Sequence, residues 1–87
     1  MEYLHYELDA GSRDIIQVTL DKQANVKLLD GINYQRYRNG KQHSYYGGLA
    51  KVSPINMKPP HQGRWHIVVD LGGYAGTVRA SVQVKRG

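Results

Sequence analysis

Arg64-Trp65-His66-Ile67-Val68-Val69-Asp70-Leu71 is the stretch that decides the fold. Its apolar side chains recur at every second position, which is the period of a β-strand with one buried face. The buried face is formed by Trp65, Ile67 and Val69, and the opposite face by His66, Val68 and Asp70. Residues 72–76 contain three glycines and predict a hairpin turn into a last strand over 77–84. We expect Trp65 to anchor the core.

The same period recurs toward the N-terminus. Residues 2–8, 13–20 and 25–29 alternate between apolar and polar side chains, and turn residues separate them. The pattern predicts three strands in an antiparallel meander. The inward positions of all these strands, including the last one, are Leu4, Tyr6, Leu8, Ile16, Val18, Leu20, Val26, Leu28, Val78, Ala80, Val82 and Val84.

The period breaks over residues 30–40. Asp30 is a suitable N-cap, Tyr34 and Tyr37 share a face at i,i+3, and Asn39-Gly40 is a typical helix end. This pattern predicts one or two helical turns. Residues 43–46 then predict an extended segment that Gly47-Gly48 ends or bulges.

Further along, residues 51–57 predict an edge strand, because Pro54 lacks the N–H that a central strand needs. Residues 59–63 read as a loop.

Six to seven strands at short spacing predict an all-β fold, namely a small antiparallel β-sandwich or squat, jelly-roll-like barrel with one short helical turn. No connection is long enough to hold a crossover helix, so parallel βαβ units are excluded. With 87 residues, we expect a single domain over 1–87.

Composition favours a cytoplasmic protein. The chain has no cysteine, which suits a reducing compartment. Residues 1–5 lack the basic and apolar regions of a signal peptide, and the longest apolar run, Ile67-Val68-Val69, is far too short to span a membrane.

Charge is segregated along the chain, whose formal net charge is +5. Residues 1–30 hold six acidic and three basic side chains, whereas residues 31–69 hold six basic side chains and no acid. Such a segment attracts an anionic partner, unless its charges are solvated and balanced by acids on neighbouring strands. Both interpretations stay open.

Several motifs together resemble a bacterial family described only as a domain of unknown function, DUF 1883. They are Asn25-Val26-Lys27-Leu28-Leu29-Asp30, Asn33-Tyr34, Tyr37-Arg38, Tyr45-Tyr46-Gly47-Gly48, Ser53-Pro54 and Trp65-His66-Ile67-Val68-Val69-Asp70-Leu71-Gly72-Gly73. The resemblance covers nearly the whole chain and implies a small β-rich domain, found in some relatives beside a TIR-type domain. It implies no catalytic or binding residue.

Catalytic signatures are missing from the sequence. There is no cysteine, no serine lies in a nucleophile-elbow pattern, and five of the seven acids fall within the first 21 residues. The four histidines, His5, His43, His61 and His66, show no i,i+4 spacing typical of a metal site. We expect no enzyme activity, no metal and no cofactor.

One group of residues suggests ligand binding, because it interleaves aromatic and basic side chains. It consists of Tyr34, Arg36, Tyr37, Arg38, Lys41, Tyr45 and Tyr46. Aromatic rings stack on bases or sugars while guanidinium groups bind phosphate. The alternative is structural: the chain has seven tyrosines and no phenylalanine, so Tyr34 and Tyr37 could fix the helical turn to the sandwich.

Two functions of different classes follow. The favoured one is an interaction or assembly domain that binds a protein partner or itself, through the edge strand near Val52–Met57 or exposed tyrosines. The other is a module for nucleic acid, a nucleotide or another anionic or planar ligand, with carbohydrate as a weaker variant. A membrane partner is not expected.

Overall fold

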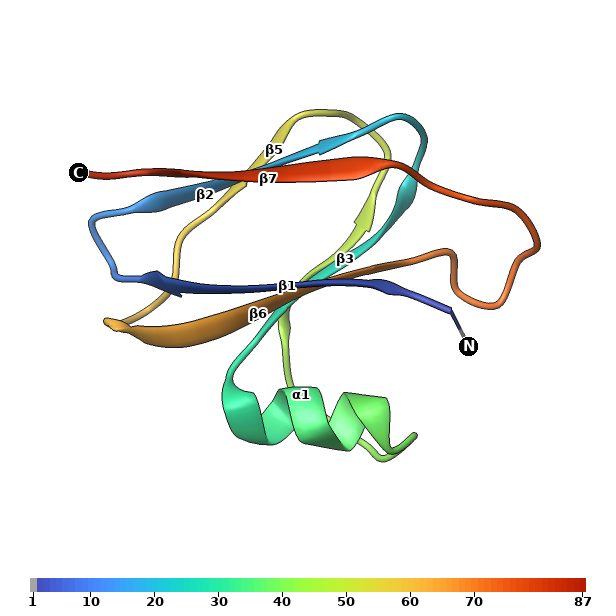
Figure 1. Ribbon diagram of the computed structural model, residues 1–87, viewed down its shortest axis with the longest axis horizontal. Helices are drawn as coiled ribbons and strands as arrows, with labels where there is room; N and C mark the ends of the chain where they lie inside the picture. The colour runs from blue at the N-terminus through green and yellow to red at the C-terminus, as the bar shows by residue number, and fades with distance from the viewer. Residues whose placement is uncertain (1) are drawn as a thin grey trace.

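Two antiparallel sheets pack face to face in the computed structural model, which describes residues 2–87 (Figure 1). The four-stranded sheet contains, in spatial order, β1 (Leu4–Ala10), β6 (Gly63–Asp70), β3 (Ala24–Leu29) and β4 (Tyr46–Ala50). The three-stranded sheet contains β5 (Ile55–Met57), β2 (Ile15–Leu20) and β7 (Ala80–Lys85), with β2 in the centre. The predicted small all-β sandwich is confirmed.

Strand pairing differs from the predicted meander, which is wrong. β1 pairs with β6, Leu4 opposite Val69, while β2 lies in the other sheet. The predicted hairpin at residues 72–76 is wrong for the same reason, since β6 and β7 belong to different sheets. Alternation shows which face of a strand is buried, but it does not show which strand lies beside it.

The inner faces of the two sheets form the main core. β6 contributes Trp65, Ile67 and Val69, all at most 2% exposed, so the predicted anchoring role of Trp65 is confirmed. Its indole Nε1 donates to the carbonyl oxygen of His61 at 3.2 Å, which satisfies the polar end of the buried ring.

Helix α1 (Gly31–Arg38) lies on the outer face of the four-stranded sheet, below β6 and β3 in Figure 1. Asp30 caps it by accepting from the backbone N–H of Asn33, and Tyr34 and Tyr37 are its buried residues. Gly40 follows the C-cap at φ 69°, a conformation that glycine adopts without strain. The predicted helix is therefore confirmed, with its cap and its buried face.

The two glycines after Tyr46 lie inside a strand, so their predicted role as a strand end or bulge is wrong. β4 runs through Gly47 and Gly48, which pair with Lys27 and Val26 of β3. A Cβ atom at Gly47 would meet the carbonyl oxygen of Val26 and lie 2.8 Å from Met57 Cε. Position 47 requires glycine because the neighbouring strand and the second sheet approach so closely that a side chain would not fit.

β5 occupies an edge of its sheet, as predicted for the segment containing Pro54, although only three residues form the strand. On this side of the sandwich β4 leads directly into β5. On the other side β1 and β7 face each other, and Tyr6 bridges them by donating to the carbonyl oxygen of Ala80 at 3.0 Å.

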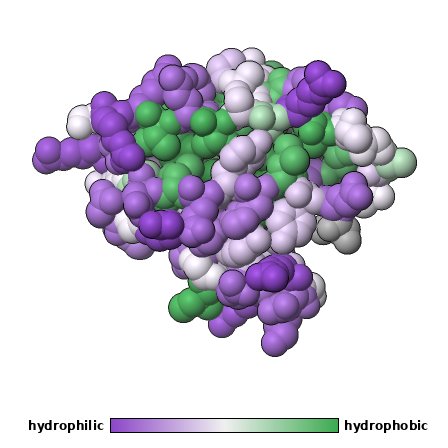
Figure 2. All heavy atoms as spheres, in the orientation of Figure 1, coloured by the Kyte–Doolittle hydropathy of each residue, from purple (hydrophilic) through white to green (hydrophobic). Residues whose placement is uncertain are grey.

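Figure 2 shows apolar side chains in a band between β7 and β1, bordered by polar groups. The partly buried residues that pack on the core from these two strands are Leu4, Tyr6, Leu8, Ala80, Val82 and Val84. The band is therefore the rim of the core on the open side of the sandwich. Within residues 2–87, no helix is long and apolar enough to cross a membrane.

Candidate functional site

Aromatic rings fill the space between α1 and the four-stranded sheet. The ring of Tyr34 stacks on His5 at a centroid distance of 4.1 Å and on His66 at 4.6 Å. Below it, His5 Nε2 and His66 Nδ1 share a hydrogen bond of 2.8 Å. Burial lowers the pKa of both imidazoles and so favours their neutral forms, and at least the ring that accepts this hydrogen bond must be neutral.

A second tyrosine of α1 binds a buried carboxylate. The Tyr37 hydroxyl donates to Asp70 Oδ2 at 2.7 Å, while Asn25 Nδ2 and the Gly72 N–H both donate to Oδ1 at 2.9 Å. Burial alone raises the pKa of Asp70, but these hydrogen bonds outweigh it, so the pKa lies below its ordinary value. Burial beside this carboxylate raises the pKa of Tyr37.

These contacts define what the two tyrosines do. Tyr34 and Tyr37 are each 7% exposed, and their rings face the sheet rather than solvent. The structural interpretation, in which they fix the helix to the sandwich, is confirmed. The predicted stacking surface therefore lacks their ring faces.

The basic members of the predicted site remain at the surface. Arg36, Arg38 and Lys41 are exposed around the C-terminal end of α1, and none of them belongs to an ion pair of the described residues 2–87. Arg64, by contrast, pairs with Glu7 at 3.1 Å and Asp9 at 2.8 Å on β1. For Arg64, acids on the neighbouring strand do balance the charge.

Tyr45 contacts Lys27, a residue of β3. Lys27 Nζ lies 4.5 Å from the centre of the Tyr45 ring and 5.0 Å from that of Tyr37, and it contacts His43 Nε2 at 3.2 Å. The ammonium group is thus held against two rings, which leaves one face of Tyr45 partly covered.

Exposed apolar side chains gather at the β4 edge. Six large hydrophobic residues are exposed in residues 2–87, and four of them fall within 45–52: Tyr45 (43%), Tyr46 (54%), Leu49 (56%) and Val52 (72%). The Tyr46 ring lies at the rim of the core, 6.3 Å from the Trp65 ring. Leu49 pairs with Asn25, which bonds Asp70 on the α1 face of the sheet, so Leu49 lies on that face.

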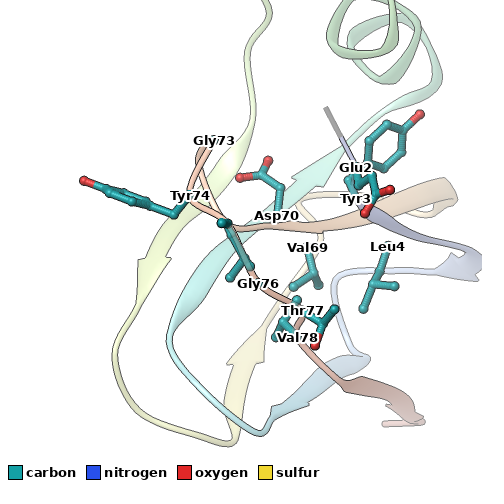
Figure 3. Close-up of a pocket in the computed structure, with 12 residues that line it drawn as sticks. Glu2, Tyr3, Leu4, Val69, Asp70, Gly73, Tyr74, Gly76, Thr77 and Val78 are labelled. Carbon is teal, nitrogen blue, oxygen red and sulfur yellow. The ribbon is translucent and has the colours of Figure 1, made fainter.

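A hollow of about 750 Å³ lies at one end of the sandwich, between the start of β1 and the loop after β6 (Figure 3). Its wall includes Leu4, Val69 and Val78, and its charged lining residues are Glu2 and Asp70. Figure 3 shows the Tyr74 side chain pointing away from this apolar wall. An apolar hollow whose charged groups are acidic does not suit the anionic ligand that the sequence suggested.

Metal-ligating groups do not cluster in the part of the chain that the structure describes. Residues 2–87 contain no group of three or more His, Asp or Glu side chains placed to hold a metal ion. The two imidazoles that meet, His5 and His66, bond each other. Sequence reasoning missed this pair, although His5 and His66 both sit at outward positions of their strands and only the β1–β6 pairing was needed to join them.

Comparison with other proteins gives one finding. No curated protein and no solved structure matches the chain, so no site residue is transferred from a relative. One family model, described as Domain of unknown function (DUF1883), matches residues 1–87, which is the whole sequence. The resemblance seen in the sequence motifs is confirmed, and the chain belongs to this family.

Proposed function

We propose that the domain is a non-catalytic interaction module that recognises a protein by adding a partner strand at the β4 edge. The observation that supports this proposal is the concentration of exposed apolar side chains at residues 45–52. Exposed apolar groups at the surface of a small domain are typical of interaction sites.

The β4 edge lacks the features by which proteins usually protect an exposed strand. Such features are charged side chains, proline, very short length, or cover by another element. Tyr46–Ala50 contains neither a charge nor a proline, and in the described chain its only hydrogen-bonded neighbour strand is β3. Gly47 and Gly48 leave the backbone of the edge accessible to a partner.

The other three edges are protected. β5 has three residues and follows Pro54. β1 includes Glu7 and Asp9, and Arg86 crosses from the end of β7 to the carbonyl oxygen of Asp9 at 3.0 Å. β7 is flanked by basic residues, and Tyr6 occupies the carbonyl oxygen of Ala80. Among the sheet edges, β4 is therefore the one suited to strand addition.

In strand addition, the backbone provides affinity and the side chains provide specificity. Backbone N–H and C=O groups of β4 supply affinity that does not depend on the partner's sequence. Leu49 supplies apolar contact on the α1 face, and Tyr46 supplies it on the core face, which selects partner strands with small or apolar side chains opposite them.

Site-specific crosslinking tests this function. A photoreactive p-benzoylphenylalanine replaces Leu49 in one variant and Ile32, an exposed apolar residue of α1, in a matched control. In the native host, we expect the position-49 variant to form a defined adduct whose partner mass spectrometry identifies, and the position-32 variant to form none. Equal crosslinking at both positions, or no adduct at 49, contradicts the proposal.

A second candidate function rests on Arg36, Arg38 and Lys41, whose charges are not neutralised by ion pairs of the described residues. These residues suit a phosphate-bearing ligand, and binding to single-stranded DNA or RNA would then weaken steeply with salt. The double variant Arg36→Ala/Arg38→Ala would weaken it further, whereas Lys58→Ala/Lys85→Ala, which removes the same charge elsewhere, would not. No binding at low salt removes this candidate.

A further inference from the structure

We infer that the partner strand comes from a second copy of this chain. In this arrangement, which rests on the proposed function, the β4 strands of two copies pair antiparallel about a twofold axis at Gly48. The two four-stranded sheets then join into one continuous sheet with eight strands. A twofold interface needs a surface that is complementary to itself, and β4 meets this requirement in both size and charge.

Size complementarity follows from the register. With Gly48 opposite Gly48 of the second copy, Leu49 lies opposite Gly47 and Tyr46 lies opposite Ala50. Each large side chain therefore meets a small one on the same face of the joined sheet. Leu49 covers the strand where the partner has no side chain, and Tyr46 lies beside Ala50, a small residue already buried in its own core, so the Tyr46 ring meets no bulky side chain there.

Charge complementarity separates β4 from the other edges. The same register places Lys51 opposite the neutral side chain of Tyr45, so it sets no two charged side chains directly opposite each other. Self-pairing of β7 about Val82 would instead set Arg79 opposite Lys85. Self-pairing about the middle of β1 would set Glu7 opposite Glu7. Like charges directly opposite each other destabilise a strand pair, so β4 is the edge suited to self-pairing.

The expected dimer is weak. Five residues per strand and a few apolar side chains form an interface below the size of stable complexes, which bury roughly 1,200–2,000 Å². We therefore expect a dissociation constant in the range of about 10–100 µM. A domain present at high local concentration, or repeated in one assembly, would pair at this affinity.

Sedimentation equilibrium tests whether the partner is a second copy of the chain. The wild-type chain of 9.8 kDa should show a reversible monomer–dimer equilibrium. Leu49→Lys should raise the dissociation constant at least ~10-fold, since two ammonium groups enter an apolar contact, while the matched surface change Ile32→Lys should leave it unchanged. Equal circular dichroism and thermal melting of the three proteins would show that the variants fold.

Cysteine pairing tests the register, and the natural chain has no cysteine to interfere. Tyr45→Cys and Lys51→Cys are mixed in equal amounts and oxidised mildly. Directly opposite residues have the Cα separation that a disulfide needs, so the mixed 45–51 disulfide should form in excess over both homodimeric ones. Predominance of the 45–45 or 51–51 product would overturn the register.

The outcomes separate the two proposals. A strict monomer at millimolar concentration, together with a position-49 adduct to a different protein in the host, overturns the second copy and leaves β4 as the recognition edge. A strict monomer with no adduct at 49 overturns both. A dimer that Leu49→Lys leaves intact places the dimer contact elsewhere and overturns the inference.

Discussion

The Tyr37 hydroxyl lies 2.7 Å from Asp70 Oδ2, and this contact joins helix α1 to the last residue of β6. The same carboxylate accepts from Asn25 on β3 and from the backbone of Gly72. One buried side chain thus connects the helix, two neighbouring strands and the loop that crosses to the second sheet. Since β4 pairs with β3 along residues 46–50, the contacts that hold β3 in place also position the β4 edge.

Tyr37→Phe should destabilise the domain. The change removes one donor from a buried carboxylate, which costs about 1.5–3 kcal/mol because hydrogen bonds to charged groups are strong. Tyr6→Phe is the matched control, since its half-buried hydroxyl donates to a neutral carbonyl group and should cost about 0.5–1.5 kcal/mol. Urea unfolding measures both free energies. A Tyr37→Phe variant as stable as the wild type would show that the bond does not hold the helix.

Stability should fall as the pH drops through 6.5 because of His5 and His66. Burial lowers the pKa of both imidazoles in the folded state below the ordinary value of 6.5. As pH falls through 6.5, the unfolded chain binds protons that the folded chain does not, so the stability present above that pH is lost. Carboxylates such as Asp70 titrate at lower pH.

Urea unfolding at several pH values checks this dependence. His66→Gln removes one imidazole of the pair and should flatten the slope, although it also lowers stability at neutral pH. His61→Gln is the control, because His61 lies in the exposed loop before β6. A slope unchanged by His66→Gln would assign the pH dependence to other groups.

Gly47→Ala should destabilise β4 more than Gly48→Ala does. Both residues have positive φ, 107° and 146°, and so both variants carry backbone strain of about 1–3 kcal/mol. At Gly47 the added methyl group also meets the Val26 carbonyl oxygen and Met57, whereas the space around Gly48 is open. Thermal melting compares the two variants. Equal losses would mean that β4 shifts to accommodate the methyl group.

Much of the fold was accessible from the sequence because burial follows side-chain alternation. The inward faces of β2, β3 and β6 and the cap and buried face of α1 were predicted correctly. The pairing of the strands was not predicted correctly. The turn at residues 11–14 and the loop after Asp70 each lead the chain from one sheet to the other. Such a crossing depends on tertiary packing and leaves no periodic signal.

The candidate site was less accessible. Aromatic and basic residues between 34 and 46 formed one motif in the sequence, but the helix turns Tyr34 and Tyr37 inward while Arg36 and Arg38 stay outside. A helical period of 3.6 separates neighbours in this way. The β4 edge was not recognised in the sequence because Gly47 and Gly48 are typical of a strand end or bulge. In the structure, Gly47 lies within the strand because it packs closely against the backbone of Val26.

Amide hydrogen exchange at low and high protein concentration tests most directly whether two copies meet at β4. The account predicts that exchange of amides in residues 46–50 slows as concentration rises from micromolar to millimolar, while amides of β1 and β7 keep their rates. Slowing confined to β1 or β7, or rates in β4 that do not change over this range, would contradict it.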